Sequence, residues 1–325
     1  MKTSAAPSYA LSQDLRAAVT DLEQVNPWVG LWRFVSIGTL FLSFVVLAWS
    51  SSTLVGFIGF SAIAGLLYAF WLVCTHDTTH QTLTGWRWFD TWMPRLVAYP
   101  MLWPYGTYAR LHRLHHAWNG IDLRDPERVQ WTVAEYRQAQ PWQQWYVRHQ
   151  WSMDLFVLGG LGLIAKTVYQ GLRLRRQVPD LGRSLLLDGV GILAMQSGFA
   201  IVAILQGRFI DYLLFWLVLE RIIGAVQQAR DHLEHYALWK TEKNHQMTQL
   251  YACRNLTTSS FVNWLMGGLP DHAIHHAFPG IPFNHLPEAF RRTQAVLERH
   301  QRPLLVRDRG YLRETLHFSS QIQLI

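Results

Sequence analysis

The chain has 325 residues, of which 50% are hydrophobic and only 16% are charged. About a quarter of the residues of a soluble globular protein are charged, so this composition argues against an ordinary soluble domain. The mean hydropathy is nevertheless close to zero, at +0.03, which excludes a chain buried wholly in lipid. We therefore expect several membrane spans joined to a substantial water-facing part.

The cysteine content and the net charge narrow the possible class of protein further. Cys74 and Cys253 are too few for a disulfide scaffold, a four-cysteine metal site or an iron–sulfur cluster. Cys74 ends an apolar run and is expected to be a small buried hydrophobic residue. The formal net charge of +7 would suit nucleic-acid binding, but the arginines lie beside apolar runs, which favours a membrane protein.

The first predicted elements are a polar N-terminal helix and two membrane spans. Residues 1–27 show no signal-peptide pattern and are expected to form a cytosolic or interfacial helix. The apolar runs at 33–50 and 53–75 are long enough to cross a bilayer, which takes about 20 residues. The serines at 50–52 predict a short turn between them, so we expect a helical hairpin.

The following long segment is expected to lie outside the bilayer core. Residues 86–105 combine many aromatic residues with three prolines, which is typical of a broken helix at the membrane interface. Residues 155–172 are apolar enough to dip into the bilayer, but Lys166 and the arginines at 173–176 favour an interfacial helix. The tryptophans of this region are explained by an interfacial aromatic belt.

A second hairpin is predicted from the apolar runs at 185–206 and 209–227, with a turn at Gln206–Arg208. Glu220 and Arg221, inside the last run, are expected to form an internal pair that faces the other helices. Lysine and arginine are frequent between 75 and 183 and nearly missing from the two short turns. Because this bias marks the cytoplasmic side, both termini are expected in the cytosol.

The expected fold is therefore all-α and integral to the membrane. A single domain over residues 1–325 has four transmembrane helices in two hairpins, and a cytosolic helical cap, formed by 76–183 and 228–325, holds a histidine-rich site for two metals.

Nine of the 15 histidines stand in short groups that follow the predicted spans or lie in the cap. Residues three or four apart share one face of a helix, so each group can present its imidazoles to one metal ion. These candidate metal ligands are His76, His80, His112, His115, His116, His235, His272, His275 and His276. One group alone is often an accident of sequence, but two identical His-x-x-His-His patterns together with a third pair indicate a metal site.

Nine imidazoles exceed what one ion binds, so two metals are implied. All-imidazole ligation suits zinc, copper, iron or nickel, whereas a structural zinc site would need only four ligands, commonly with cysteine. A paired, nitrogen-rich site beside a membrane favours redox-active iron. We expect no catalytic residues beyond the ligands.

Carboxylates near these groups are interpreted as acceptors for the N–H groups of the ligands. Asp77, Asp271 and Asp125 fit this role, although Asp271, which follows a proline, suits helix capping equally well. Asp231 and His232 are kept as further supporting residues or extra ligands. The remaining histidines are expected to be surface or capping residues; they are His149, His245, His285, His300 and His317.

The three histidine groups, in this order and with spans between them, resemble the histidine boxes of the membrane fatty-acid desaturase superfamily. The resemblance extends from about Thr53 to Pro287. Residues 231–236 resemble the Asn-x-x-x-His element of that superfamily, with Asp231 where asparagine is frequent, and this implies that His235 is a ligand. Residues 277–287 resemble desaturases, whereas 117–128 resemble carotenoid and alkane hydroxylases.

The resemblance implies two iron ions, dioxygen as co-substrate, and electrons from a ferredoxin, rubredoxin or cytochrome b5 system with its reductase. Because no such domain is recognised in the sequence, a separate donor is expected, and a basic cytosolic face could steer an acidic one. The substrate is expected to be lipid-like.

The predicted reaction is oxidation of an unactivated C–H bond, most simply desaturation of a fatty acyl chain. Hydroxylation or ketolation of a carotenoid or alkane and oxidative decarboxylation to a terminal alkene remain alternatives. A membrane metal transporter is the alternative of a different class; it would place its ligands inside the spans.

Overall fold

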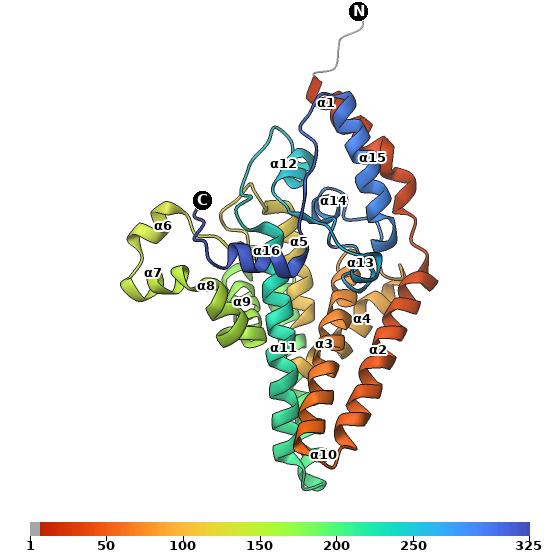
Figure 1. The fold of residues 1–325 in the computed structure, drawn as a ribbon, viewed down its shortest axis with the longest axis vertical. Helices are drawn as coiled ribbons and strands as arrows, with labels where there is room; N and C mark the ends of the chain where they lie inside the picture. Colours follow the sequence, from red (N-terminus) through yellow and green to blue (C-terminus); the bar gives the residue numbers. More distant parts are fainter. Residues whose placement is uncertain (1–6) are drawn as a thin grey trace, which may run out of the picture. The chain divides into compact units, whose positions relative to one another are not determined.

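The computed structural model describes residues 7–325, which form two compact units. Unit 1 contains the described residues up to Asn26, Leu114–Ala139 and Asp231–Ile325, and unit 2 contains Pro27–Arg113 and Gln140–Arg230. Helices make up nearly all of the regular structure (Figure 1), so the all-α prediction is confirmed.

Unit 2 carries the long helices. Its elements are α2 (Pro27–Trp49), α3 (Leu54–Thr78), α4 (Arg87–Ala98), the 3-10 helix η2 (Tyr99–Met101), α7 (Pro141–Arg148), α8 (Gln150–Ser152), the π-helix η3 (Met153–Leu158), α9 (Gly159–Leu174) and α10 (Leu181–Leu205). Two further helices begin in unit 2 and end in unit 1, namely α5 (Tyr105–Trp118) and α11 (Phe209–His235).

Unit 1 is built from shorter elements. They are α1 (Pro7–Val19), η1 (Thr20–Glu23), α6 (Val133–Gln138), α12 (His245–Tyr251), β1 (Asn255–Leu256), α13 (Ser260–Leu265), α14 (His272–Ala277), η4 (Phe283–His285), α15 (Leu286–Arg299), β2 (Arg307–Asp308) and α16 (Tyr311–Phe318). β1 and β2 form a two-stranded parallel sheet with Asn255 opposite Arg307. The core of this unit packs α1 against α15, where Leu15, Ala289 and Leu297 are fully buried.

Helices α2 and α3 pack side by side through aromatic side chains. The hydroxyl of Thr53 caps α3 by accepting the N–H of Gly56 at 3.1 Å. Phe41 stacks on Tyr68 with ring centroids 4.6 Å apart. Gly38 allows the indole of Trp71 to approach the α2 backbone, because a Cβ there would lie 2.8 Å from that ring.

Four helical stretches are long and apolar enough to cross a membrane: Pro27–Trp49, Leu54–Thr78, Gln150–Leu174 and Leu181–Leu205. Three of them coincide with predicted spans. The fourth, Gln150–Leu174, is the segment for which the sequence favoured an interfacial helix. The predicted span at 209–227 lies within α11 but is not among the four, since charged residues interrupt its apolar sequence.

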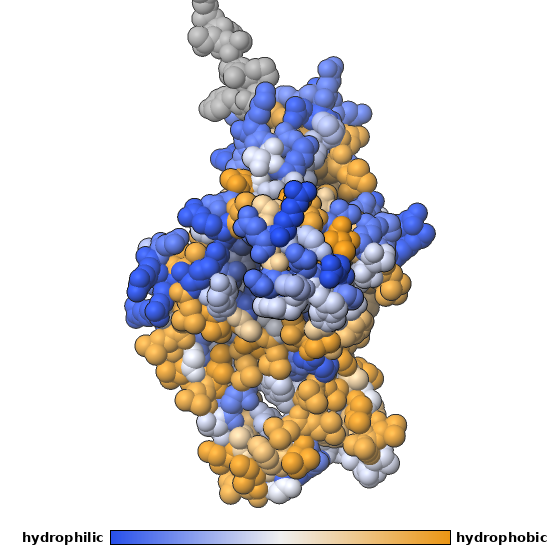
Figure 2. Space-filling view, turned by 90° about the vertical axis from the view of Figure 1, so that its left-hand side faces the viewer, coloured by the Kyte–Doolittle hydropathy of each residue, from blue (hydrophilic) through white to orange (hydrophobic). Residues whose placement is uncertain are grey.

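The outer surface of unit 2 is hydrophobic, as contact with lipid requires. Large side chains on α10 are the clearest case: Leu186, Leu193 and Leu205 are 69%, 68% and 80% exposed. Figure 2 shows broad hydrophobic areas on the surface of this unit. A water-facing monomer rarely exposes apolar patches of this extent, and the pattern fits a membrane protein.

The prediction of an internal charged pair in α11 is confirmed for Glu220 only, because the side chain of Arg221 is 33% exposed. Arg221 binds the carboxylate of Glu220, which is 1% exposed, and donates to the carbonyl oxygens of Val157 at 2.6 Å and Leu158 at 3.2 Å. Glu220 accepts the N–H of Leu161 at 2.8 Å. The pair therefore satisfies the backbone groups that are released where η3 breaks into α9.

Candidate metal centre

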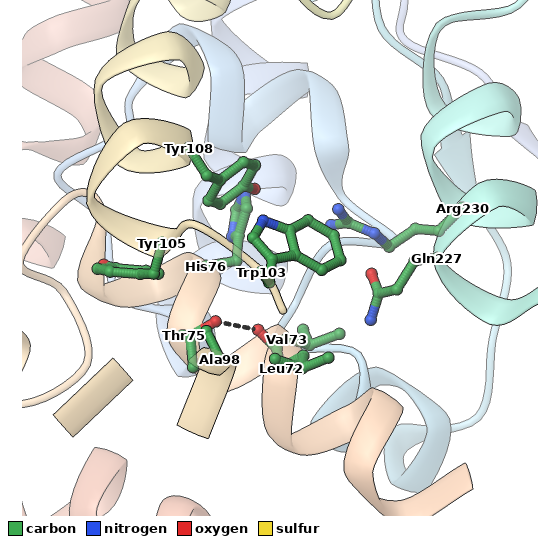
Figure 3. A pocket seen from close by; sticks show the side chains of 10 residues that line it. All are labelled: Leu72, Val73, Thr75, His76, Ala98, Trp103, Tyr105, Tyr108, Gln227 and Arg230. Carbon is green, nitrogen blue, oxygen red and sulfur yellow. Dashed lines mark hydrogen bonds between the residues drawn. The ribbon is translucent and has the colours of Figure 1, made fainter. Parts of the chain in front are cut away.

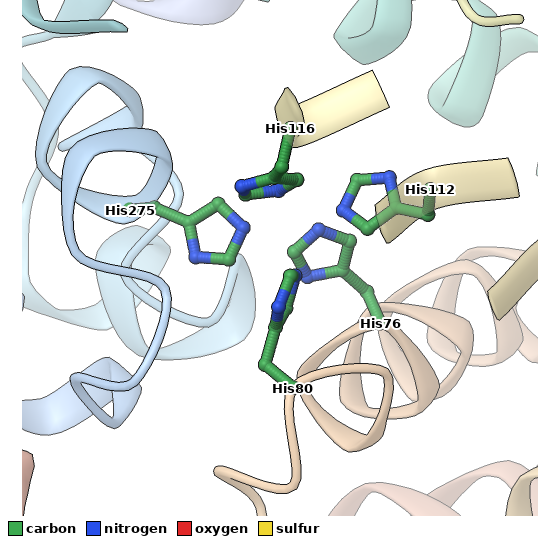
Figure 4. Close-up of side chains that lie close together, drawn as sticks. All are labelled: His76, His80, His112, His116 and His275. Carbon is green, nitrogen blue, oxygen red and sulfur yellow. The ribbon is translucent and has the colours of Figure 1, made fainter. Parts of the chain in front are cut away.

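Unit 2 brings together three of the predicted ligands. His76 lies in the last turn of α3, His80 in the turn that follows it, and His112 on α5. The ring centroids of His76 and His112 are 4.6 Å apart, those of His80 and His112 are 5.3 Å apart, and those of His76 and His80 are 5.8 Å apart. Figure 4 shows these three imidazoles turned toward one another. We call them the unit 2 cluster.

Hydroxyl side chains allow the polar end of α3 to be buried. Thr75 donates to the carbonyl oxygen of Leu72 at 2.6 Å, Thr78 to that of Thr75 at 2.6 Å, and Thr79 to that of His76 at 2.8 Å. These bonds satisfy the hydroxyls locally, and α3 ends at Thr78, before His80. The predicted helical spacing of four residues therefore becomes a helix end followed by a turn.

The carboxylate of Asp77 links the unit 2 cluster to α2. One of its oxygens accepts from Arg33 at 2.7 Å, and the other lies 3.4 Å from Nδ1 of His76. The side chains of Arg33 and Asp77 are 0% and 5% exposed. This geometry fits the predicted role of Asp77 beside a ligand, and the sequence analysis missed the part of Arg33.

The start of α5 is anchored by a buried carboxylate on α10. Asp188 accepts the backbone N–H of Thr107 at 2.7 Å, that of Gly106 at 3.2 Å, and the hydroxyl of Tyr99 at 2.9 Å. A negative charge at a helix N-terminus satisfies the free N–H groups and stabilises the helix. Asp188 thus fixes the helix that carries His112.

A small cavity of about 20 Å³ lies beside His76. Its wall includes Leu72 and Val73 of α3, and Figure 3 shows the indole of Trp103 and the side chain of Arg230 around it. The ring of Tyr108, which also lines the cavity, stacks on His112 with centroids 5.3 Å apart. Aromatic and aliphatic side chains thus line this cavity together with the polar side chains of Thr75, Gln227 and Arg230.

Unit 1 brings together the other six predicted ligands, which we call the unit 1 cluster. They come from the ends of α5 and α11 and from α14, and are His115, His116, His235, His272, His275 and His276. The Nε2 atom of His235 lies 3.1 Å from that of His115 and 3.0 Å from that of His272. Two nitrogens that bind one ion at about 2.0–2.1 Å each lie about 3 Å apart, so these separations fit shared ligation.

The outward edges of these rings are held by polar partners. Nδ1 of His115 lies 2.9 Å from a carboxylate oxygen of Asp125, and Nδ1 of His276 lies 3.0 Å from Oε1 of Gln249. Such partners fix the orientation of an imidazole and raise its basicity as a ligand. Each ring therefore directs Nε2 toward the interior of the cluster.

One nitrogen in the unit 1 cluster is well placed to bind a metal ion. The Nε2 atom of His276 is buried and has no hydrogen-bond partner among the described residues. A buried polar atom without a partner costs about 1–3 kcal/mol, and a metal ion would satisfy it. His235, Cys253, His272 and His276 can present one donor atom each within 4.8 Å of one another.

The pKa values of two of these imidazoles, His276 and His115, are shifted in opposite directions. Burial lowers the pKa of His276 well below its usual value, and the neighbouring histidines lower it further. For His115, burial also lowers the pKa, but the charges of Asp125 and Glu127 outweigh it and raise the pKa to about 9. His276 is therefore held in the neutral, ligating form, while Asp125 stabilises positive charge at His115.

The other predicted supporting residues have different surroundings. Asp271 binds Arg307, and its side chain makes no cap at α14, so the alternative capping role is wrong. Asp231 is half-buried and close enough to His115 to raise its pKa. His232 is buried on α11. A direct role for these residues in metal binding stays a prediction.

Two of the remaining histidines bind away from the clusters, as expected. His300 lies 2.7 Å from a carboxylate oxygen of Asp14, and His285 bonds the carbonyl oxygen of Leu22 at 2.8 Å. His245 lies closer to the unit 1 cluster, since its Nε2 bonds the carbonyl oxygen of His116 at 2.9 Å.

The sequence analysis missed three residues that lie beside the unit 1 cluster, namely Gln249, Cys253 and Asn119. Gln249 on α12 holds His276, as described above. Sγ of Cys253 lies 3.8 Å from Nδ1 of His235 and accepts from the amide of Asn119 at 3.2 Å. Sγ of Cys253 therefore lies on the Nδ1 side of the His235 ring, and it is within 4.8 Å of donor atoms of His272 and His276. These residues lie outside the histidine groups, and their only signal is proximity after folding.

Comparison with known proteins identifies a matching family and a relative. A model of the fatty acid desaturase family matches residues 51–307. A protein of Sorghum bicolor named "Probable fatty acid desaturase DES1" is 24% identical over 304 residues, which cover 89% of this chain and 76% of the sorghum protein. The matched range includes all nine candidate ligands.

Proposed function

We propose that this protein uses dioxygen and two iron ions to oxidise an unactivated C–H bond of a fatty acyl chain. The chain belongs to the fatty acid desaturase family and is thus a membrane oxidoreductase with a role in lipid desaturation or oxidation. The carrying observation is the convergence of buried imidazoles whose outward nitrogens are held by Asp125 and Gln249. This arrangement orients neutral nitrogen donors toward a cation.

The proposed ligands of the two irons are the histidines of the unit 2 cluster and the unit 1 cluster. All-imidazole ligation is compatible with iron, and the iron would supply the activation of dioxygen that no side chain can provide. Cys253 is proposed to hold His235 at Nδ1, where its sulfur lies 3.8 Å away.

The protein's own contribution is orientation and exclusion of water. Asp125 accepts the N–H of Nδ1 of His115 and so directs Nε2 toward the interior of the cluster; because Asp125 also raises the pKa of His115, a metal would bind there by displacing the proton of Nε2. Asp77, fixed by Arg33, stands beside Nδ1 of His76. Trp103 and Tyr108 form an aromatic part of the wall beside the unit 2 cluster, and Gln227 and Arg230 form a polar part of it.

Location and electron supply follow from the same proposal. Both termini and the two clusters are proposed to face the cytosol, as the distribution of lysine and arginine in the sequence indicates. Electrons are proposed to come from a separate ferredoxin, rubredoxin or cytochrome b5 with its reductase.

Reconstitution tests the proposal. The full chain, purified in a lipid nanodisc and loaded with iron, is combined with a reductase and an electron carrier, and products from acyl, alkane and carotenoid substrates are identified by mass spectrometry. We expect oxygen consumption that depends on substrate, with an acyl alkene as product. The matched variants are His276→Ala, which should abolish turnover, and His317→Ala, at an exposed position, which should not.

Each other outcome has a defined meaning. An alcohol or ketone from an alkane or carotenoid, or a terminal alkene shortened by one carbon, would replace desaturation of an acyl chain as the reaction. Metal uptake into vesicles without oxygen consumption would contradict the proposal and favour transport.

A further inference from the structure

The turn between α9 and α10 carries a dense group of arginines. Four exposed side chains lie within residues 173–183, and we call them the arginine turn; they are Arg173, Arg175, Arg176 and Arg183. Asp180 is the only acidic residue in the same stretch of sequence. The turn is therefore a concentrated positive charge on the surface of unit 2.

The backbone of the arginine turn is fixed by its own hydrogen bonds. The carbonyl oxygen of Leu174 accepts the N–H of Gln177 at 2.9 Å, and that of Asp180 accepts the N–H of Ser184 at 2.9 Å. The side chains of Leu174 and Leu181, which flank the turn, are 1% and 0% exposed. A frame that is already ordered lowers the entropic cost of binding a ligand.

Close packing joins this frame to the start of α5. A Cβ at Gly171 would lie 2.8 Å from Cγ2 of Thr107, so glycine allows α9 to approach α5 this closely. Thr107 is held in turn by Asp188 on α10. The arginine turn therefore belongs to the same packed region of unit 2 as the first turn of the helix that carries His112.

The arginine turn stands where apolar surface gives way to polar surface. It connects two stretches that are long and apolar enough to cross a membrane, Gln150–Leu174 and Leu181–Leu205. Leu172 is 49% exposed and Leu186 is 69% exposed, as expected for side chains that contact hydrocarbon. At 1.5 Å per residue, Leu186 lies about 5 Å from Arg183 along α10. The headgroup layer of a bilayer is roughly 5–8 Å thick, so the guanidinium groups lie at its level.

The arginine at the other end of α10 is bound by the protein itself. Arg208 pairs with Asp211 at 2.8 Å, donates to the carbonyl oxygen of Trp49 at 3.1 Å, and lies 4.5 Å from the centroid of its ring. In contrast, three members of the arginine turn form no ion pair or side-chain hydrogen bond within the fully described unit 2; they are Arg175, Arg176 and Arg183. These three guanidinium groups are available to an anion from outside the protein.

We propose that the arginine turn binds the headgroups of anionic phospholipids. A guanidinium can donate two parallel hydrogen bonds to phosphate oxygens, and each basic residue at an anionic membrane surface strengthens the attraction about fivefold. A zwitterionic headgroup carries the same phosphate, but its ammonium group cancels the charge. Because apolar side chains directly beside the turn suit hydrocarbon, the partner is a lipid of the surrounding bilayer rather than a dissolved acidic protein.

Native mass spectrometry of the full chain, released from detergent micelles, tests the proposal without requiring turnover or metal. The protein is titrated with phosphatidylglycerol or with phosphatidylcholine that has the same acyl chains, and the retained lipids are counted. We expect several-fold tighter retention of phosphatidylglycerol, which is lost at high salt because exposed charges are screened there. Equal retention of the two lipids, or retention that does not change with salt, would overturn the proposal.

The test variant replaces three arginines of the turn together, by Arg175→Gln, Arg176→Gln and Arg183→Gln. It should lower the retention of phosphatidylglycerol by about tenfold or more and leave that of phosphatidylcholine unchanged. The matched control removes the same charge from exposed positions of unit 1, by Arg16→Gln, Lys243→Gln and Arg299→Gln. This control should retain phosphatidylglycerol as the original chain does. Equal losses in the two variants would show that net charge alone attracts the lipid, which would contradict a site at the turn.

Further measurements separate charge from folding and lipid from protein. Lysine at the same three positions keeps the charge and should preserve most of the retention. Should the triple glutamine variant fail to fold, Arg183→Gln alone should lower retention about fivefold; unchanged retention would contradict the proposal. Loss of binding to an acidic ferredoxin in the triple variant, with unchanged retention of phosphatidylglycerol, would overturn the proposal and assign the turn to a protein partner.

Discussion

The two histidine clusters use the same side chain but are built differently. In the unit 2 cluster, the carboxylate of Asp77 lies beside His76 and forms a buried ion pair with Arg33 of α2. In the unit 1 cluster, separate partners such as Asp125 and Gln249 hold individual rings. The first cluster therefore depends on the packing of two apolar helices, and the second on a distributed polar network.

This difference shows that apolar and polar surroundings support a cluster of ligands in different ways. Where helices are apolar, each added polar group needs its own partner, so few are used, and the hydroxyls at the end of α3 bond their own backbone. Where the structure is a conventional core, many polar partners can be accommodated. The following variants test whether the clusters differ in this way.

The largest effect is expected from removal of a ligand in the unit 1 cluster. His276→Ala removes a buried nitrogen with no other partner and should abolish iron binding and turnover. Iron content by plasma mass spectrometry provides the measurement, with His300→Ala as the control because His300 binds Asp14 instead. Full iron content in His276→Ala would exclude it as a ligand.

Removal of Arg33 should destabilise unit 2 strongly. Arg33→Leu removes the cation that is paired with the buried carboxylate of Asp77, and loss of one partner from such a pair costs about 3–5 kcal/mol. Thermal unfolding in detergent measures the loss, and the double variant Arg33→Leu with Asp77→Asn should recover part of it. The control is Arg208→Leu, whose pair with Asp211 is partly exposed and should contribute about 0–1 kcal/mol. Equal losses would contradict the comparison.

Asp125→Asn should weaken metal binding without unfolding the chain. Loss of a partner that holds a ligand typically costs about 10–100-fold in metal affinity, and His115 retains its other contacts. Competition with a chelator measures the affinity. Asp122→Asn, at an outer pair with Arg124, is the control and should be neutral. The reverse ranking of these two variants would show that Asp125 does not orient His115.

A smaller effect is expected at Cys253. Because a sulfur 3.8 Å from His235 is a weak acceptor, Cys253→Ala should lower metal affinity by about tenfold or less, at the low end of what such partners contribute. Cys253→Ser, which keeps an acceptor, should recover part of it. Cys74→Ala, at a buried cysteine of α3, should leave metal affinity unchanged. A complete loss of iron in Cys253→Ala would instead indicate direct ligation.

The smallest effect is a pH dependence of stability at α6. The hydrogen bonds from Arg128 lower the pKa of Glu135 from 4.5 to about 2. A depressed carboxyl pKa stabilises the folded state above the unfolded pKa, and this contribution is lost as pH falls from about 4.5 to 2. Glu135→Gln should therefore flatten the pH dependence of the unfolding temperature in that window. An unchanged profile would contradict the assigned contact.

The sequence predicted what depends on local pattern. The spacing of the histidines identified the nine candidates, three apolar runs were placed on helices that can span a membrane, and Asp125 was recognised beside its group. Two helices were harder to assign as membrane spans or interfacial helices. Glu220 and Arg221 interrupt the apolar run of α11, and the apolar residues 155–172 continue a helical stretch that already begins with α8 at Gln150.

Long-range partners were beyond reach of the sequence. Arg33 lies 44 residues from Asp77, and Gln249 lies 27 residues from His276. No periodicity connects such positions, because they meet only through packing of separate helices. At Asp271 the local pattern suggested the wrong partner. Its position directly before α14 is typical of a helix cap, but its carboxylate binds Arg307 on β2.

Metal analysis of the purified full chain tests the central claim most directly. We predict about two irons per chain after loading, with loss of iron in His80→Ala of the unit 2 cluster as well as in His276→Ala of the unit 1 cluster. A chain that binds no iron, or that keeps both irons when either histidine is replaced, would contradict the account.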